Sequence, residues 1–77
     1  MSRARWIVRG RVQGVMFRAS ARERAEALGL SCEASNRDDG SVEIAAEGAP
    51  EALDELDRWV REGPALSRVE SVERRPG

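Results

Sequence analysis

The sequence predicts an α+β fold of the ferredoxin-like type, a split β-α-β sandwich in which two helices cover one face of an antiparallel sheet. Three observations support this prediction. Runs of alternating apolar and polar residues indicate four strands, stretches with helical apolar spacing indicate two helices, and their order is β-α-β-β-α-β. Because no repeat, low-complexity segment or linker interrupts this order, we expect residues 1–77 to form a single domain.

A strand over residues 4–9 and a helix beyond the following loop are predicted for the first part of the chain. In the strand, the residues expected to face the core are Ala4, Trp6 and Val8, and those on the other face are Arg5, Ile7 and Arg9. In the helix, one apolar stripe is formed by Ala21, Ala25 and Leu28. Gly29 is expected to end this helix, since glycine readily adopts the left-handed conformation found there.

A β-hairpin is predicted next, with strands over residues 30–35 and 41–46. The turn between them, residues 36–40, contains an Asp-Gly pair, which is a strong hairpin signal. The residues expected to face the core are Cys32 and Ala34 in the first strand and Val42, Ile44 and Ala46 in the second. The residues expected to face outward in the second strand are Ser41, Glu43 and Ala45.

A second helix and a last strand complete the predicted fold. Pro50 is suited to the first turn of a helix, and Gly63-Pro64 would end it. Its apolar stripe consists of Leu53, Leu56 and Val60, widened by Trp59. The last strand is expected at about residues 66–73. Its two valines are three positions apart, at 69 and 72, which fits a β-bulge better than regular alternation.

The loop between the first strand and the first helix is predicted to bind a phosphate group. Gly10 and Gly14 allow the backbone to adopt positive φ angles or to approach a ligand closely. Backbone N–H groups in such a turn, together with the start of the helix, can form an anion site. Arg18 adds a guanidinium group that matches phosphate oxygens. The alternative is an ordinary tight turn followed by a solvated arginine.

The residue types that are missing restrict the possible chemistry. The chain contains no histidine, lysine or tyrosine, and its one cysteine is Cys32. Without histidine, the usual general base near neutral pH is absent, and a zinc site is disfavoured. Asp38 and Asp39 could hold magnesium, but adjacent acids before a glycine are more often turn residues. We therefore expect no metal and no cofactor.

Charge and composition favour a small anionic ligand over a macromolecule or a membrane. Residues 1–24 contain seven arginines and one acid, whereas residues 25–77 contain six arginines and 13 acids. Only three aromatic residues are present, too few for the stacking surface of an RNA-binding domain of this topology. No segment approaches the roughly 20 apolar residues of a membrane span, and a lone cysteine fits a cytoplasmic location.

Residues 8–18, VRGRVQGVMFR, resemble the first signature of the acylphosphatase family at every characteristic position. The second signature is matched in part, because Asn36, Gly40, Val42 and Gly48 stand at its spacing while residues 32–35, CEAS, depart from it. Without the resemblance, Asn36 would be interpreted as a turn residue that bonds its own backbone. The resemblance covers about residues 5–73. The family usually continues with a further C-terminal strand, so we expect one strand edge to be uncovered.

The resemblance implies a hydrolase that cleaves acyl phosphates to a carboxylate and inorganic phosphate, the latter also acting as an inhibitor. It implies that Arg18 and the loop N–H groups hold the phosphoryl group and that Asn36 orients the attacking water. The implied phosphate-binding residues are Gln13, Gly14, Val15, Met16, Phe17 and Arg18. We expect a monomer. The alternative is a non-catalytic module on the same fold that binds phosphate, another anion or a protein partner.

Overall fold

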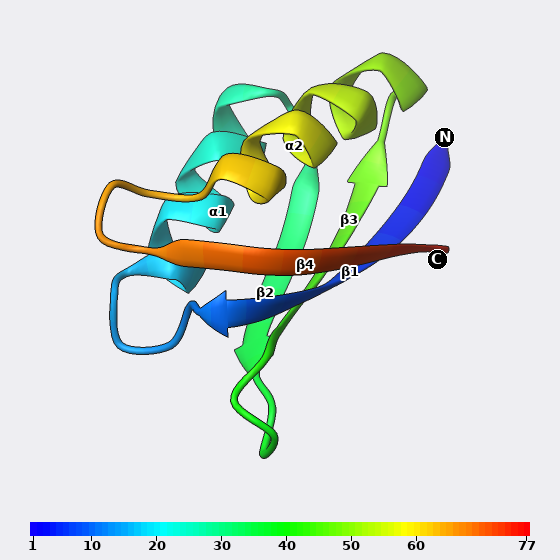
Figure 1. The fold of residues 1–77 in the computed structure, drawn as a ribbon. Coiled ribbons are helices and arrows are strands. Elements are labelled where there is room, and N and C mark those ends of the chain that lie inside the picture. The colour runs from blue at the N-terminus through cyan, green and yellow to red at the C-terminus, as the bar shows by residue number, and fades with distance from the viewer.

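The structure, a computed structural model, describes residues 1–77 and contains four strands and two helices (Figure 1). In chain order, the elements are β1 (Ser2–Arg11), α1 (Phe17–Ala27), β2 (Ser31–Asn36), β3 (Val42–Gly48), α2 (Pro50–Glu62) and β4 (Arg68–Pro76). This order confirms the predicted β-α-β-β-α-β arrangement. Neither helix is long and apolar enough to cross a membrane.

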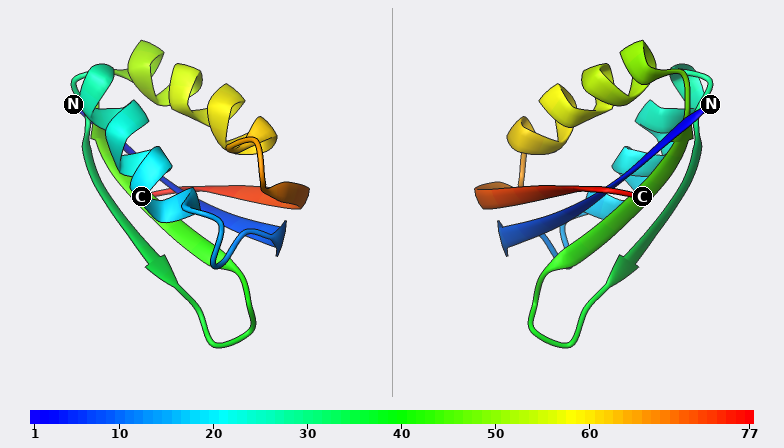
Figure 2. Two further views of the ribbon diagram at one scale, coloured as in Figure 1. Left: turned by 90° about the vertical axis from the view of Figure 1, so that its left-hand side faces the viewer. Right: turned by 90° about the vertical axis from the view of Figure 1, so that its right-hand side faces the viewer.

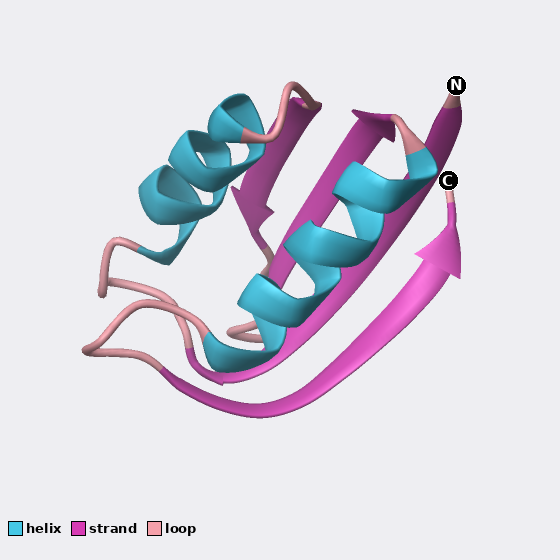
Figure 3. Ribbon diagram, turned by 90° about the horizontal axis from the view of Figure 1, so that it is seen from above, coloured by secondary structure: helices cyan, strands magenta, loops and turns pink.

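The four strands form one antiparallel sheet in the order β2-β3-β1-β4. Both helices lie on the same face of this sheet, and the other face is uncovered (Figures 2 and 3). The predicted fold class is therefore confirmed. Because β1 and β2 both run antiparallel to β3, they run in the same direction. Their C-terminal ends therefore lie at the same end of the sheet, where the strands terminate. The loop after β1 and the last residue of β2 both lie at that end of the sheet.

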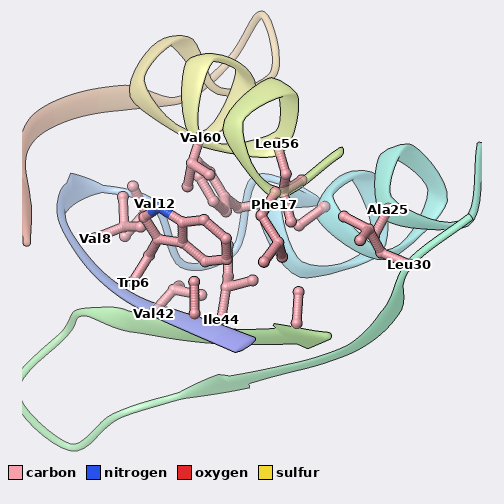
Figure 4. Close-up of a cluster of buried hydrophobic side chains, with 14 residues drawn as sticks. Trp6, Val8, Val12, Phe17, Ala25, Leu30, Val42, Ile44, Leu56 and Val60 are labelled. Carbon is pink, nitrogen blue, oxygen red and sulfur yellow. The ribbon is translucent and has the colours of Figure 1, made fainter. Parts of the chain in front are cut away.

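The hydrophobic core fills the space between the sheet and the two helices (Figure 4). Trp6 of β1 is fully buried at its centre, and Phe17 packs at the start of α1. The predicted core residues that are buried here are Ala4, Trp6, Val8, Ala21, Ala25, Val42, Ile44, Ala46, Leu53, Leu56 and Val60. Ile7 lies on the opposite face, as predicted, yet only 2% of it is exposed.

The strand bounds differ from those predicted. β1 extends beyond residues 4–9 at both ends, because it pairs with β3 on one side and with β4 on the other. β2 begins one residue later and ends one residue later than predicted, and β4 spans Arg68–Pro76 instead of residues 66–73. Backbone pairing continues through polar residues, whereas the apolar pattern that predicts strands stops at them.

The predicted bulge is present in β4. The register pairs Arg9 with Ser71 and Gly10 with Val69, which leaves Glu70 as the extra residue. Since Val69 and Val72 lie opposite Gly10 and Val8, the bulge lets both valines pack against the core. Gly10 is required at this point, because a Cβ there would lie 2.1 Å from the carbonyl oxygen of Arg68.

Two side chains of the hairpin differ from the prediction in how deeply they are buried. Ser41 was expected to face outward, but it is buried, with 1% of its surface exposed. Its hydroxyl group donates to the carboxylate of Asp39, so its polar group is satisfied within the turn. Cys32 packs against the core, as predicted, but it is only half-buried, because β2 is an edge strand with a neighbour on one side.

A polar contact inside the fold was not predicted. The indole Nε1 of the buried Trp6 donates a hydrogen bond of 2.9 Å to Oδ1 of Asp57 in α2. Arg61 donates to the same carboxylate from one turn further along the helix. Burial raises the pKa of Asp57, but the hydrogen bonds from Arg61 and Trp6 outweigh it and hold this pKa below its usual value. Arg74 covers the Trp6 ring, with its guanidinium carbon 5.5 Å from the centroid.

We expect Asp57→Ala to lower the free energy of unfolding by about 2 kcal/mol, because it leaves the buried indole N–H of Trp6 without an acceptor. Asp54→Ala is the matched control, since Asp54 binds Arg74 at the surface and such a pair contributes less than about 1 kcal/mol. Urea unfolding of both variants measures the difference. Equal losses would show that the contact between Trp6 and Asp57 contributes nothing beyond surface charge.

The difference in the free energy of unfolding between wild type and Asp57→Ala should depend on pH. The pKa of Asp57 is lower in the folded chain than in the unfolded chain, so its stabilising effect is fully present above the unfolded value, about pH 4. That effect is lost as the pH falls through the folded pKa. The difference in stability between wild type and Asp57→Ala should therefore be constant near neutral pH and shrink in acid.

Candidate active site

The loop between β1 and α1, residues 12–16, is held by buried residues on both sides. Val12 and Phe17 are each 1% exposed, and the ring of Phe17 packs against Trp59 with a centroid distance of 5.5 Å. Gly14 has a φ of 75°, and a Cβ at this position would meet nothing within 4 Å. The backbone conformation, rather than lack of space, therefore explains why glycine is suited to this turn.

Met16 is the one non-glycine residue of the chain with a positive φ, 63°. This conformation costs a residue other than glycine about 1 kcal/mol or more, and such residues are concentrated at functional sites. The Met16 side chain is 71% exposed and forms the N-cap of α1 without a side-chain hydrogen bond. The Met16 side chain is not packed in the core, so core packing does not explain this backbone conformation. The positive φ instead lets the chain turn from the loop into the first turn of α1.

The backbone N–H groups of this loop point to an anion site. None of the N–H groups from Gly14 to Ala19 donates a hydrogen bond within the chain. The first backbone bond at this end of α1 runs from the N–H of Ser20 to the carbonyl oxygen of Met16, at 3.0 Å. Unpaired donors and the positive end of the helix dipole therefore coincide, and this combination favours a bound anion.

Arg18 is the second residue of α1 and is exposed. Its guanidinium group makes no hydrogen bond or ion pair within the chain, although seven of the 13 arginines do form ion pairs. The guanidinium of Arg18 is therefore free to bind a ligand.

Asn36, the other predicted site residue, is the last residue of β2 and is exposed. It lies opposite Val42 of β3, which in turn lies opposite Val8 of β1. Since Val42 and Val8 face the core, the Asn36 side chain extends from the face of the sheet that carries α1. Its amide makes no hydrogen bond within the chain, so the alternative in which Asn36 bonds its own backbone is not observed.

Asp39 takes the turn-forming role instead. Its carboxylate accepts hydrogen bonds from the hydroxyl and the backbone N–H of Ser41, and these bonds hold the pKa of Asp39 below its usual value. The backbone closes the turn through a bond of 3.1 Å from Gly40 N–H to Arg37 O and one of 2.8 Å from Arg37 N–H to Ser41 O. Asp39 thus acts as a turn residue.

Gln13 connects the loop to the hairpin that carries Asn36. Its Nε2 donates to the carbonyl oxygens of Arg37 and Ser41, each at 2.9 Å. The predicted site residues therefore lie on two segments that are in direct contact at one edge of the sheet. Within the predicted phosphate-binding set, Phe17 can offer only its N–H group, since its ring is buried, and the Gln13 side chain faces the hairpin.

Cys32 does not have the environment of a nucleophile. Burial is the main cause that raises the pKa of its thiol, and Glu33 raises it further, whereas Arg22 opposes the shift. A thiol with a raised pKa has little thiolate near neutral pH. We therefore assign no catalytic role to it.

The fold and the loop together define a ferredoxin-like protein with a run of unpaired backbone N–H groups between its first strand and first helix. The family model described as Acylphosphatase matches residues 4–76. An Acylphosphatase of Xanthomonas oryzae pv. oryzae (strain MAFF 311018) is 53% identical over 76 residues, which span 99% of this chain and 86% of that relative. The chain therefore belongs to the acylphosphatase family and is an enzyme of that type, which confirms the resemblance noted in the sequence.

Solved structures agree with this relationship. The crystal structure of an acylphosphatase from Bacillus subtilis matches with a TM-score of 0.95 at 40% identity, over 100% of this chain and 86% of that chain. An acylphosphatase structure from Coxiella burnetii matches with a TM-score of 0.92 at 36% identity, over 97% of this chain and 79% of that chain. Family membership favours the enzyme hypothesis over a non-catalytic module.

Proposed function

We propose that residues 1–77 act as a single domain that hydrolyses acyl phosphates to a carboxylate and inorganic phosphate. The observation that supports this most strongly is the run of unpaired N–H groups from Gly14 to Ala19, a segment that also carries Arg18 with its unpaired guanidinium. An acyl phosphate offers the complementary group, a phosphoryl group whose negative charge is spread over several oxygens.

The phosphoryl group would bind at the loop. Its oxygens would accept hydrogen bonds from the loop N–H groups, and the planar fork of Arg18 would bind two of them at once. The loop N–H donors are fixed in place before the substrate arrives, because Val12 and Phe17 anchor both ends of the loop in the core. Donors fixed in this way stabilise developing charge without having to reorganise during the reaction.

Asn36 would orient the attacking water. The water oxygen attacks phosphorus in line with the bond to the acyl oxygen, and that P–O bond breaks as the carboxylate leaves with the electron pair. One proton of the water passes to a phosphoryl oxygen, so inorganic phosphate forms without a protein base. This route suits a chain with no histidine. Positioning and electrostatic stabilisation would supply most of the rate enhancement.

Hydrolysis of benzoyl phosphate in ¹⁸O-labelled water tests this mechanism. Attack at phosphorus places the label in inorganic phosphate, whereas attack at the carbonyl carbon places it in benzoate. We expect the label in phosphate for the enzyme-dependent part of the turnover, measured by mass spectrometry of both products. Label in benzoate would exclude in-line attack at phosphorus, and a rate equal to the spontaneous one would favour a non-catalytic anion-binding module.

A further inference from the structure

The side chain of Gln13 forms a bridge that the proposed chemistry does not use. Its amide nitrogen lies 2.9 Å from the carbonyl oxygen of Arg37 and 2.9 Å from that of Ser41, the pair of residues that closes the hairpin turn. Both partners can only accept a hydrogen bond, so the NH₂ end of the amide must face them. Both of its N–H groups are then occupied, and neither is available for a phosphate oxygen.

The strand end that Gln13 contacts has little other support. β2 is an edge strand that pairs only with β3, and residues 36–40 are exposed. The two bonds from Gln13 are the only side-chain hydrogen bonds that reach the hairpin backbone from another segment. Arg37, one of the two acceptors, directly follows Asn36 in the chain. Besides the backbone pairing of Asn36 with Val42, this contact is what links Asn36 to the loop.

Gln13 itself is held firmly. It follows the buried Val12 and precedes Gly14, so one side of it is anchored in the core and the other turns into the loop. A loop residue next to the buried Val12 thus donates to the turn that follows Asn36.

We propose that Gln13 is a positioning residue. It holds Asn36 at the correct distance from the phosphoryl group by binding the two residues that close the hairpin turn. This inference rests on the proposed function, because it assumes that Asn36 orients the water. It assigns Gln13 an effect on turnover rather than on phosphate binding. A displacement of the water-orienting group by about 1 Å can reduce the rate by roughly 100-fold.

Gln13→Met tests the proposal, since methionine keeps the length of the side chain but removes both donors. We expect kcat for benzoyl phosphate to fall by about 10- to 100-fold, while the inhibition constant of inorganic phosphate changes by less than about threefold. Ser67→Ala is a matched control, because it removes another side-chain bond to a loop carbonyl, that of Pro64. The control should retain kcat within about twofold, and thermal unfolding verifies that both variants are folded.

A double-mutant cycle separates positioning from an independent role. If Gln13 acts through Asn36, Gln13→Met should lower kcat by less than about threefold in an Asn36→Ala background. An equal loss in both backgrounds, full kcat in Gln13→Met, or a loss of phosphate affinity with unchanged kcat would each overturn the proposal. If Asn36→Ala alone retained full turnover, the proposed role of Asn36 would fail first, and this inference would fail with it.

Discussion

Arg18→Ala should lower kcat/KM for benzoyl phosphate by on the order of 10²–10³-fold or more, because it removes a charged, two-pronged donor from the phosphoryl oxygens. The Arg18 side chain makes no hydrogen bond or ion pair within the chain that the substitution would break, so the loss should come from the reaction and not from unfolding. Arg18→Lys should recover little of this activity, since an ammonium group cannot reproduce the planar two-pronged contact. Steady-state kinetics measure both effects.

Arg22→Ala is the matched control for Arg18. Arg22 lies one turn further along α1, is exposed and makes no ion pair within the chain. It carries the same charge but lies beyond the unpaired N–H groups, so its removal should change kcat/KM by less than about threefold, mainly at low salt. Equal losses in both variants would indicate that α1 contributes only general positive charge. Near-normal turnover in Arg18→Lys would likewise contradict a two-pronged contact.

Asn36→Ala should lower kcat by about 100-fold while leaving the inhibition constant of inorganic phosphate nearly unchanged, because Asn36 would orient the water and not anchor the phosphate. Asn36→Asp should be no better, since its carboxylate would face the negative charge of the substrate. The kcat and the inhibition constant, measured on the same samples, separate the two roles.

Ser35→Ala is the control for Asn36. Ser35 is the preceding residue of β2, is exposed and extends from the opposite face of the sheet. It should retain full turnover. If Asn36→Ala also retained full turnover, the residue would not act on the water, and the departure of residues 32–35 from the family signature would have moved the site.

The order of elements could be predicted from the sequence because the core uses regular spacing. Alternation in β1 and helical spacing in α2 each place apolar residues such as Trp6 and Leu56 on one face, and the structure buries them. The spacing of Val69 and Val72 even indicated the bulge in β4. The ends of β1 could not be predicted, because residues 2–3 and 10–11 pair through backbone N–H and C=O groups, which every one of these residue types offers.

The contacts that organise the site were harder to predict from the sequence. Gln13 donates to carbonyl oxygens 24 and 28 positions later in the chain, and every residue type offers a carbonyl oxygen. No pattern in the sequence can therefore identify its partners. Asp57 is different, because an inward-facing tryptophan requires an acceptor for its indole N–H. A search for polar residues near the apolar stripe of α2 could have found that acceptor.

The most direct measurement of the proposed site is the shift of the melting temperature with inorganic phosphate, compared among wild type, Arg18→Ala and Asn36→Ala. At 100 times its dissociation constant, a ligand that binds only the folded chain stabilises it by about 2.7 kcal/mol, or roughly 10 °C or more for a domain of this size. We expect this shift in wild type and in Asn36→Ala, and only the general salt effect in Arg18→Ala. Equal shifts in all three proteins would contradict a phosphate site formed by Arg18 and the loop.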